Sequence, residues 1–223
     1  MQKFDTPDPV SAVLDVPAAR IRLVAADRTD TTVEVLPADA TSSRDVKAAQ
    51  ETEVAYGEGV LRVAAPAANN RLLGSSGRLD VTVHLPAGSR VEAKAADAEL
   101  RTAGRLGHVA FEGARAAVEL DETGGARLVL QSGSVSVARL GGPAEIRTEK
   151  GDLRVGEAVG GTVVLSTGHG DITVAAAPGV SASLDAGTGY GRIDNSLNNT
   201  AGADAALNVR ATTAHGDITA RGL

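Results

Sequence analysis

The feature that most constrains the fold of this chain is a repeat of about 18 residues in its second half. An apolar residue that directly follows a turn recurs at steps of 18, 17, 18, 19, 21 and 25 residues. A second alternating run ends about five residues before most of these positions, so each repeat carries two short strands with a side-chain period of two. The recurring apolar residues are Leu100, Val118, Val135, Leu153, Ile172, Ile193 and Ile218.

Two short strands and two glycine turns in each repeat indicate one coil of a β-solenoid, so we predict an all-β fold. Coils of about 18–21 residues must stack about 4.8 Å apart, because neither strand can bury its apolar face alone. In this register Lys94 faces Glu112, and Arg127 faces Glu145, which places opposite charges on neighbouring strands. An antiparallel β-sandwich or roll is the alternative, since β-hairpins can use the same turns.

The first strand of each predicted coil has three inward-facing positions. We expect these positions to form columns in a core made of small and β-branched side chains. The seven sets are Val91/Ala93/Ala95, Val109/Phe111/Gly113, Ala126/Leu128/Leu130, Ala144/Ile146/Thr148, Val163/Leu165/Thr167, Leu184/Ala186/Thr188 and Val209/Ala211/Thr213.

The turn sequence STGHGDITV at 166–174 returns as TTAHGDITA at 212–220, with EKGD at 149–152 and GYGR at 189–192 as counterparts. Glycine supplies the positive φ that such a turn needs, and an aspartate can bond its own backbone just after it. We therefore interpret the repeated His-Gly-Asp first as a structural unit. The preceding threonines, Thr148, Thr167, Thr188 and Thr213, are predicted to form a column just inside the turns.

The first ninety residues are less regular, but no linker separates them from the repeats. We therefore predict a single β-repeat domain over 1–223, with irregular strands and hairpins in 1–90 and seven coils in 91–223. The expected elements of the first part are two strands in 20–36, a polar connection with room for one helical turn in 39–52, a hairpin over Gly-Glu-Gly in 54–63, and a long loop in 65–77.

Composition restricts the partners and the compartment. The 22 basic and 28 acidic residues give a net charge of −6 with both signs scattered, whereas nucleic acids and anionic membranes need a basic face. The chain has no cysteine, which excludes disulfides and thiol chemistry. The first residues, MQKFDTPDPV, contain no apolar run, and no apolar stretch reaches 18 residues. We expect no signal peptide, no nucleic-acid or membrane partner, and a cytoplasmic, soluble protein.

The sequence contains no pattern typical of an enzyme, neither G-x-S-x-G nor H-E-x-x-H nor a P-loop lysine. Asp152 and Asp171 should lie one strand spacing apart, but Arg192 interrupts the acidic row. We expect no catalytic residue, no cofactor and no metal ion.

One set of turn side chains is the candidate interaction surface, and we call it the turn ridge. It consists of Lys150, His169, Tyr190 and His215. If the coils stack in sequence order, the two histidines lie two coils apart, about 9.6 Å at the strand spacing. That separation is too large for both to bind one zinc ion.

RLDVTVHLPAGSRVEA at 78–93 runs into reiterated T-x-x-G-D-[IL]-x-V units, and over roughly residues 10–220 the chain resembles the bacterial β-strand-repeat proteins called "putative adhesin". The resemblance implies a β-solenoid-like fold and no established biochemical activity.

The sequence thus predicts a non-catalytic β-solenoid scaffold, adhesin-like, that binds an unknown protein partner or associates with itself. No capping helix follows Ile218, so we expect self-association through the C-terminal edge, residues 207–220. The alternative is an exported carbohydrate- or cell-surface-binding adhesin module.

Overall fold

A computed structural model describes residues 1–65 and 77–223, and within them it is all-β apart from one α-helix and one short 3-10 helix. The strands form a large mixed sheet. The chain divides into two compact units, Met1–Ala116 and Ala117–Leu223, which are described one at a time. Strand β9 (Arg105–Ser132) runs across the boundary.

The strands of the first unit form two walls. In one wall β1, β4 and β7 are antiparallel neighbours, and β7 continues in parallel to β3 and the second half of β8. In the other wall β5 and β6 are antiparallel, and β6 continues in parallel to β2 and the first half of β8. The bounds are β1 Gln2–Asp5, β2 Ser11–Asp15, β3 Ala18–Ala26, β4 Asp30–Pro37, β5 Glu53–Gly57, β6 Val60–Ala64, β7 Leu79–Pro86 and β8 Arg90–Ala103.

Most sequence expectations for the first unit are confirmed. Strands β3 and β4 occupy the predicted 20–36 segment, and β5 and β6 form the predicted hairpin. The hairpin turn uses positive φ at Glu58 and Gly59, 52° and 76°. The single helical turn was an underestimate, because α1 spans Ser43–Glu51 with the Ser42 hydroxyl accepting a hydrogen bond from the Asp45 amide. The loop predicted at 65–77 falls mostly outside the described residues.

The second unit consists of successive layers, each made of two short strands that follow one another in sequence. Every pairing between described strands of this unit is parallel, so the antiparallel sandwich or roll is wrong here. The strands are β10 Val135–Leu140, β11 Ala144–Lys150, β12 Leu153–Ala158, β13 Gly161–His169, β14 Ile172–Ala176, β15 Ala182–Tyr190, β16 Ile193–Ser196, β17 Leu207–His215 and β18 Ile218–Gly222, with a 3-10 helix at Gly202–Asp204.

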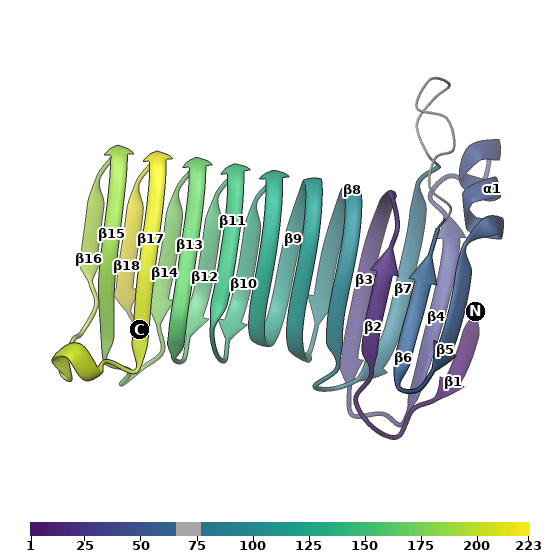
Figure 1. The fold of residues 1–223 in the computed structure, drawn as a ribbon, viewed down its shortest axis with the longest axis horizontal. Helices are drawn as coiled ribbons and strands as arrows, with labels where there is room; N and C mark the ends of the chain where they lie inside the picture. Colours follow the sequence, from purple (N-terminus) through teal and green to yellow (C-terminus); the bar gives the residue numbers. More distant parts are fainter. Residues whose placement is uncertain (66–76) are drawn as a thin grey trace. The chain divides into compact units, whose positions relative to one another are not determined.

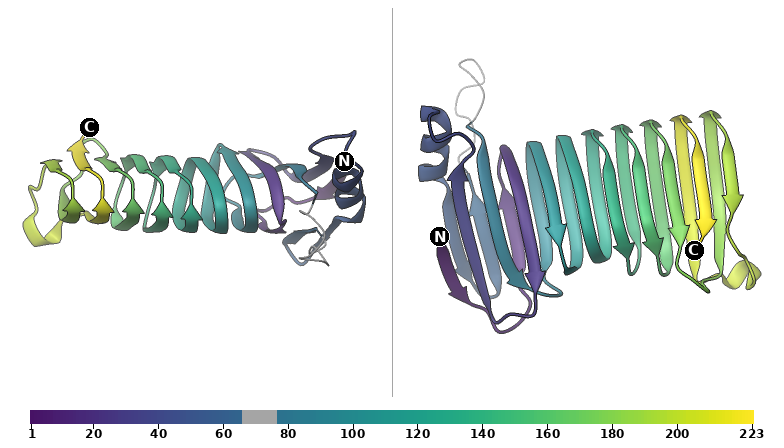
Figure 2. Two further views of the ribbon diagram at one scale, coloured as in Figure 1. Left: turned by 90° about the horizontal axis from the view of Figure 1, so that it is seen from above. Right: turned by 180° about the vertical axis from the view of Figure 1, so that it is seen from behind.

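The layers do not follow the order of the sequence. Strand β17 lies between β13 and β15, and β18 lies between β14 and β16. Figure 1 shows the yellow β17 between the green β13 and the yellow-green β15, and Figure 2 shows the same order from behind. The 207–222 layer is therefore internal and the 182–196 layer is at the end. The prediction that 207–220 forms the exposed edge is wrong.

The burial pattern gives a physical reason for this order. Along one inward column Val174 is followed by Ala220 and then by Asn195. Val174 and Ala220 are fully buried, and Asn195 is exposed. A polar side chain at an inward position costs least at the end of the stack, where water reaches it. The layer that carries it therefore occupies the end.

The predicted core columns are confirmed except at that end and at Gly113, which is half-buried. The inward triplets of β11, β13 and β17 are buried, whereas Leu184, Ala186 and Thr188 of β15 are half-buried. Both predicted charge pairs form, with Lys94 Nζ 3.8 Å from Glu112 Oε2 in the first unit and Arg127 Nε 3.9 Å from Glu145 Oε2 in the second. The period-two pattern therefore assigned inward and outward positions correctly.

Candidate interaction surface at the turns

Threonine and glycine connect each turn of the second unit to its neighbour. The Thr167 hydroxyl donates to the Gly151 carbonyl at 3.0 Å, and the Thr213 hydroxyl donates to the Gly170 carbonyl at 3.1 Å. Gly170 has φ +149°, and a Cβ there would lie 2.2 Å from the Gly151 carbonyl oxygen. The threonine column and the positive φ predicted from sequence are both present. Glycine is required here because the neighbouring backbone leaves no room for a side chain.

The aspartates connect the layers rather than their own turns. Asp152 Oδ1 accepts a hydrogen bond from the Asp171 amide at 2.9 Å, and Asp171 Oδ1 accepts one from the Asp217 amide at 2.8 Å. At the end of the row Asp217 accepts one from the Arg192 amide and pairs with its guanidinium at 3.6 Å. The expectation that each aspartate bonds its own backbone is wrong, because a neighbouring layer offers a turn N–H that would otherwise lack a partner.

The remaining turn position carries the turn ridge. All four ridge side chains are exposed, and their order in space is Lys150, His169, His215, Tyr190. The two imidazole rings stack with centroids 4.7 Å apart and planes 3° apart. The Tyr190 ring stacks on His215 at 5.0 Å and remains 74% exposed. The ridge is therefore a continuous stack of three flat rings with a lysine at one end.

The structure corrects the distance predicted within the ridge. His169 and His215 lie on neighbouring strands rather than two layers apart, because the 207–222 layer is inserted next to the 161–176 layer. Within the described part of the chain, no cluster of three or more His, Cys, Asp or Glu side chains is arranged to bind a metal ion. The stack thus offers ring faces and edges, with two imidazoles and a phenol as its polar groups.

A shallow, open hollow of about 680 Å³ borders the ridge. Its lining includes the ridge residues Lys150 and His169 and the side chains of Glu149 and Ser166. Donors and acceptors thus lie beside the ring faces, which is the combination that a protein side chain or a loop can contact.

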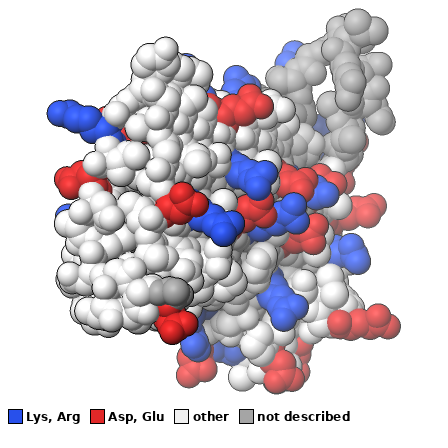
Figure 3. Space-filling model, turned by 60° about the vertical axis from the view of Figure 1, so that its left-hand side comes forward, with Lys and Arg blue, Asp and Glu red and all other residues white. Residues whose placement is uncertain are grey.

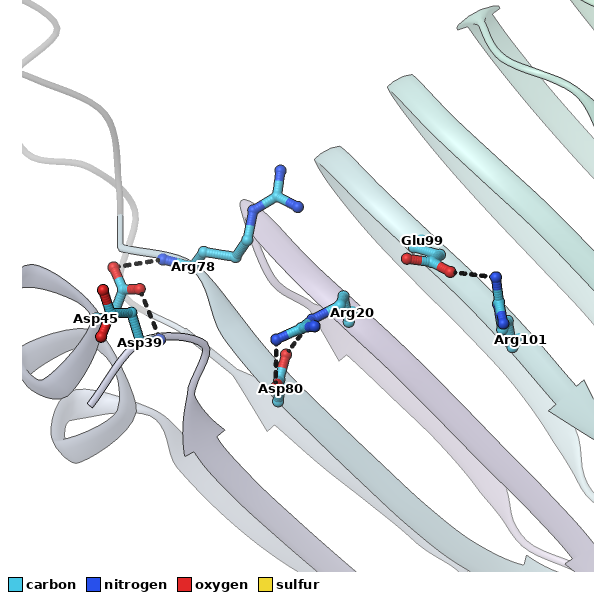
Figure 4. A network of polar contacts seen from close by, with 7 residues as sticks. All are labelled: Arg20, Asp39, Asp45, Arg78, Asp80, Glu99 and Arg101. Carbon is cyan, nitrogen blue, oxygen red and sulfur yellow. Dashed lines mark hydrogen bonds and ion pairs between the residues drawn. The ribbon is translucent and has the colours of Figure 1, made fainter. Parts of the chain in front are cut away.

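A second surface lies in the first unit, and no sequence pattern indicated it. A groove of about 380 Å³ crosses β4, β7, β3 and β8, and Figure 4 shows its ion pairs. Arg20 binds Asp80 through two hydrogen bonds of 2.7 Å, and Arg101 pairs with Glu99 at 2.7 Å. Arg20 and Asp80 come from strands far apart in sequence, so no local pattern reveals that pair, whereas Glu99 and Arg101 lie two residues apart on β8.

Beside this groove, Asp45 holds the start of α1 against the strands. Its carboxylate accepts hydrogen bonds from the Arg78 amide at 3.1 Å and the Asp39 amide at 3.2 Å (Figure 4). Because the arginines of the main pairs already face carboxylates, the groove is better explained as a structural network than as a ligand site. Neither helix in the described part of the chain has the length and the apolar run that a membrane span requires.

The comparisons with known proteins concern the fold. No family model and no curated protein matches the chain. A solved structure of a putative adhesin from Bacteroides fragilis is similar with a TM-score of 0.58 and 13% identity, covering 98% of this chain and 95% of that one. A putative cell adhesion protein from Clostridium sporogenes is similar with a TM-score of 0.41 and 13% identity, covering 100% and 98%. These two neighbours are thus bacterial proteins named for adhesion, consistent with the resemblance to the putative adhesin proteins, and the Bacteroides fragilis structure shows the fold.

Proposed function

We propose that this chain is a non-catalytic, adhesin-like β-solenoid scaffold that binds a protein partner through the turn ridge. The solenoid assignment is supported by the parallel pairing of successive layers in the second unit. A non-catalytic role agrees with the absence of an enzyme motif from the sequence and with the adhesin names of the structural neighbours.

The observation that carries the proposal is the ring stack of His169, His215 and Tyr190. Thr, Gly and Asp already satisfy the hydrogen bonds of the turns, so the ridge position needs no particular side chain for folding. Nevertheless, three consecutive layers place a flat ring there and leave it in solvent. Tyrosine is enriched at the energetic centres of protein interfaces, and exposed ring faces bind at a small cost in side-chain entropy.

A photo-cross-linking experiment in the native host tests this role. A benzophenone amino acid at position 190 should give a specific adduct, and the same group at Asp185, an exposed residue of the same strand, should give none. The double variant His169→Ala, His215→Ala should remove the adduct, because it removes the rings that hold position 190. Equal adducts at positions 190 and 185, or none at 190, would contradict a role for the ridge.

The rival is an exported carbohydrate- or cell-surface-binding module. The observation that favours this rival is the Tyr190 side chain, which presents the outer face of a flat ring and a polar hydroxyl to solvent. Binding to immobilised glycans that depends on Tyr190 would support this rival. For the compartment we propose the cytoplasm, as expected from sequence, and cell fractionation with an antibody to the chain tests it.

A further inference from the structure

The end of the second unit is formed by β15 and β16, whose outer edges have no strand partner among the described residues. At the start of β15 the Ala182 amide donates to the Asn198 carbonyl at 2.9 Å, so the connection after β16 covers that residue. Strand β15 pairs with β17, and β16 pairs with β18, each on one side only. An edge strand exposes a row of backbone N–H and C=O groups, which can pair with another strand. Here two such edges lie at the same end, one on each face of the layer.

The side chains at this end are also incompletely covered. Leu184 and Ala186 are half-buried although they face inward, and Ile193 is 45% exposed. In the neighbouring 207–222 layer, the corresponding residues are at most 1% exposed. These residues are Val209, Ala211 and Ile218. The core therefore continues to the surface at the 182–196 layer, and apolar area there remains to be buried.

The charged residues of the 182–196 layer, Asp185, Arg192 and Asp194, lie at outward or turn positions, and none lies at an inward position of this layer. Figure 3, with the left-hand side of Figure 1 turned forward, shows a mostly white surface with few lysine, arginine, aspartate or glutamate side chains. Natural edge strands usually carry charges or prolines, or lie under a covering segment, and these features prevent pairing with another chain.

We propose that the 182–196 layer is a self-association surface, and that a second copy of this chain is its occupant. To form hydrogen bonds with both edges at once, a partner must present two strands that are as far apart as β15 and β16. A second copy of the chain meets this requirement, because it presents the same two strands. A two-fold axis at this end reverses the strand direction, so the contact would be antiparallel and closed as a dimer. This proposal rests on the unpaired edges and not on the turn ridge.

Light scattering on the intact chain over a wide concentration range measures the association. We expect the mass to rise from the 22.5 kDa of one chain to that of a dimer. Ala186→Lys should abolish the dimer, because it places a charge at the inward end of the core, which is open to water only in the monomer. Gly187→Lys is the matched control and should leave the dimer intact, because position 187 points outward and a Cβ there meets no atom within 4 Å.

Amide hydrogen exchange locates the contact without a substitution. In the wild-type chain, exchange in β15 and β16 should slow as the concentration rises, while β17 and β18 should be protected throughout because both their edges are paired. A monomer at every concentration would overturn the proposal. So would a dimer that survives Ala186→Lys, or one whose formation leaves exchange in β15 and β16 unchanged.

Discussion

At Gly170 the available space determines which residue the turn accepts. The residue has positive φ, and a Cβ would collide with the backbone of the neighbouring layer. Gly187, in the next-but-one layer, has neither restriction. We expect Gly170→Ala to lower the free energy of unfolding by more than about 1 kcal/mol, and Gly187→Ala to be close to neutral. Denaturant melts of the two variants make the comparison, and equal losses would contradict the turn geometry.

Asp30 provides a prediction of pH dependence in the first unit. Hydrogen bonds from Arg28, at 2.9 Å, and then from Lys3, at 3.1 Å, lower the pKa of the carboxyl from 3.8 to about 2. Because the folded pKa is depressed, the carboxylate stabilises the fold above pH 4, and this contribution is lost as the pH falls from about 4 towards 2.

An NMR titration of the Asp30 carboxyl should show the low pKa directly. Arg28→Gln should raise this pKa more than Lys3→Gln, because the Arg28 hydrogen bond has the larger effect. Asp30→Asn should remove the corresponding part of the acid-induced loss of stability. An Asp30 pKa that stays near 3.8 in the wild-type chain would show that the two ion pairs do not persist in solution.

At the scale of the elements, the aspartate row connects one layer to the next. Asp171→Ala removes the acceptor of the Asp217 amide, and Asp171→Asn keeps an oxygen acceptor there. We expect faster exchange of the Asp217 amide in the alanine variant and nearly wild-type exchange in the asparagine variant, with a loss of stability of about 1 kcal/mol for alanine. Exchange that is unchanged in both variants would mean that the amide is protected without the side chain.

The strands were predictable because their signal is local. Alternation identified the inward triplets, and the register followed well enough to predict the Lys94–Glu112 and Arg127–Glu145 pairs. The Arg20–Asp80 pair was not predictable, since it joins β3 to β7 across sixty residues. The turn ridge was located by its spacing, but its ring stacking depends on the order of the layers.

At the scale of the whole molecule, that order was the main feature that the sequence did not reveal. Successive layers carry nearly the same alternation, so either layer fits against β13 and β14 by pattern alone. The two layers differ in single residues such as Asn195. The free-energy cost of this polar side chain at an inward position depends on whether water reaches it. The 25-residue step between Ile193 and Ile218 did indicate an irregularity. The step is long because the chain needs a long connection to reach the position of the inserted layer.

Disulfide trapping tests the order of the layers, since the chain has no cysteine of its own. Ser166 and Thr212 are register partners with hydroxyl oxygens 3.2 Å apart, so Ser166→Cys with Thr212→Cys should form a disulfide readily. Ser166→Cys with Gly187→Cys should not, because the Thr212 strand lies between them. If the second pair cross-linked and the first did not, the layers would stack in sequence order.

The inserted layer also affects how the chain is synthesised. A ribosome releases residues 182–196 before residues 207–222, yet β15 and β16 pair only with strands from the later segment among the described strands. Within the second unit, from β10 and β11 up to the 161–176 layer, each new layer can dock onto the preceding one as it emerges. The next layer has no native neighbour at its moment of synthesis. It must wait, tethered and unpaired, until the following segment has emerged and the two can complete the stack together.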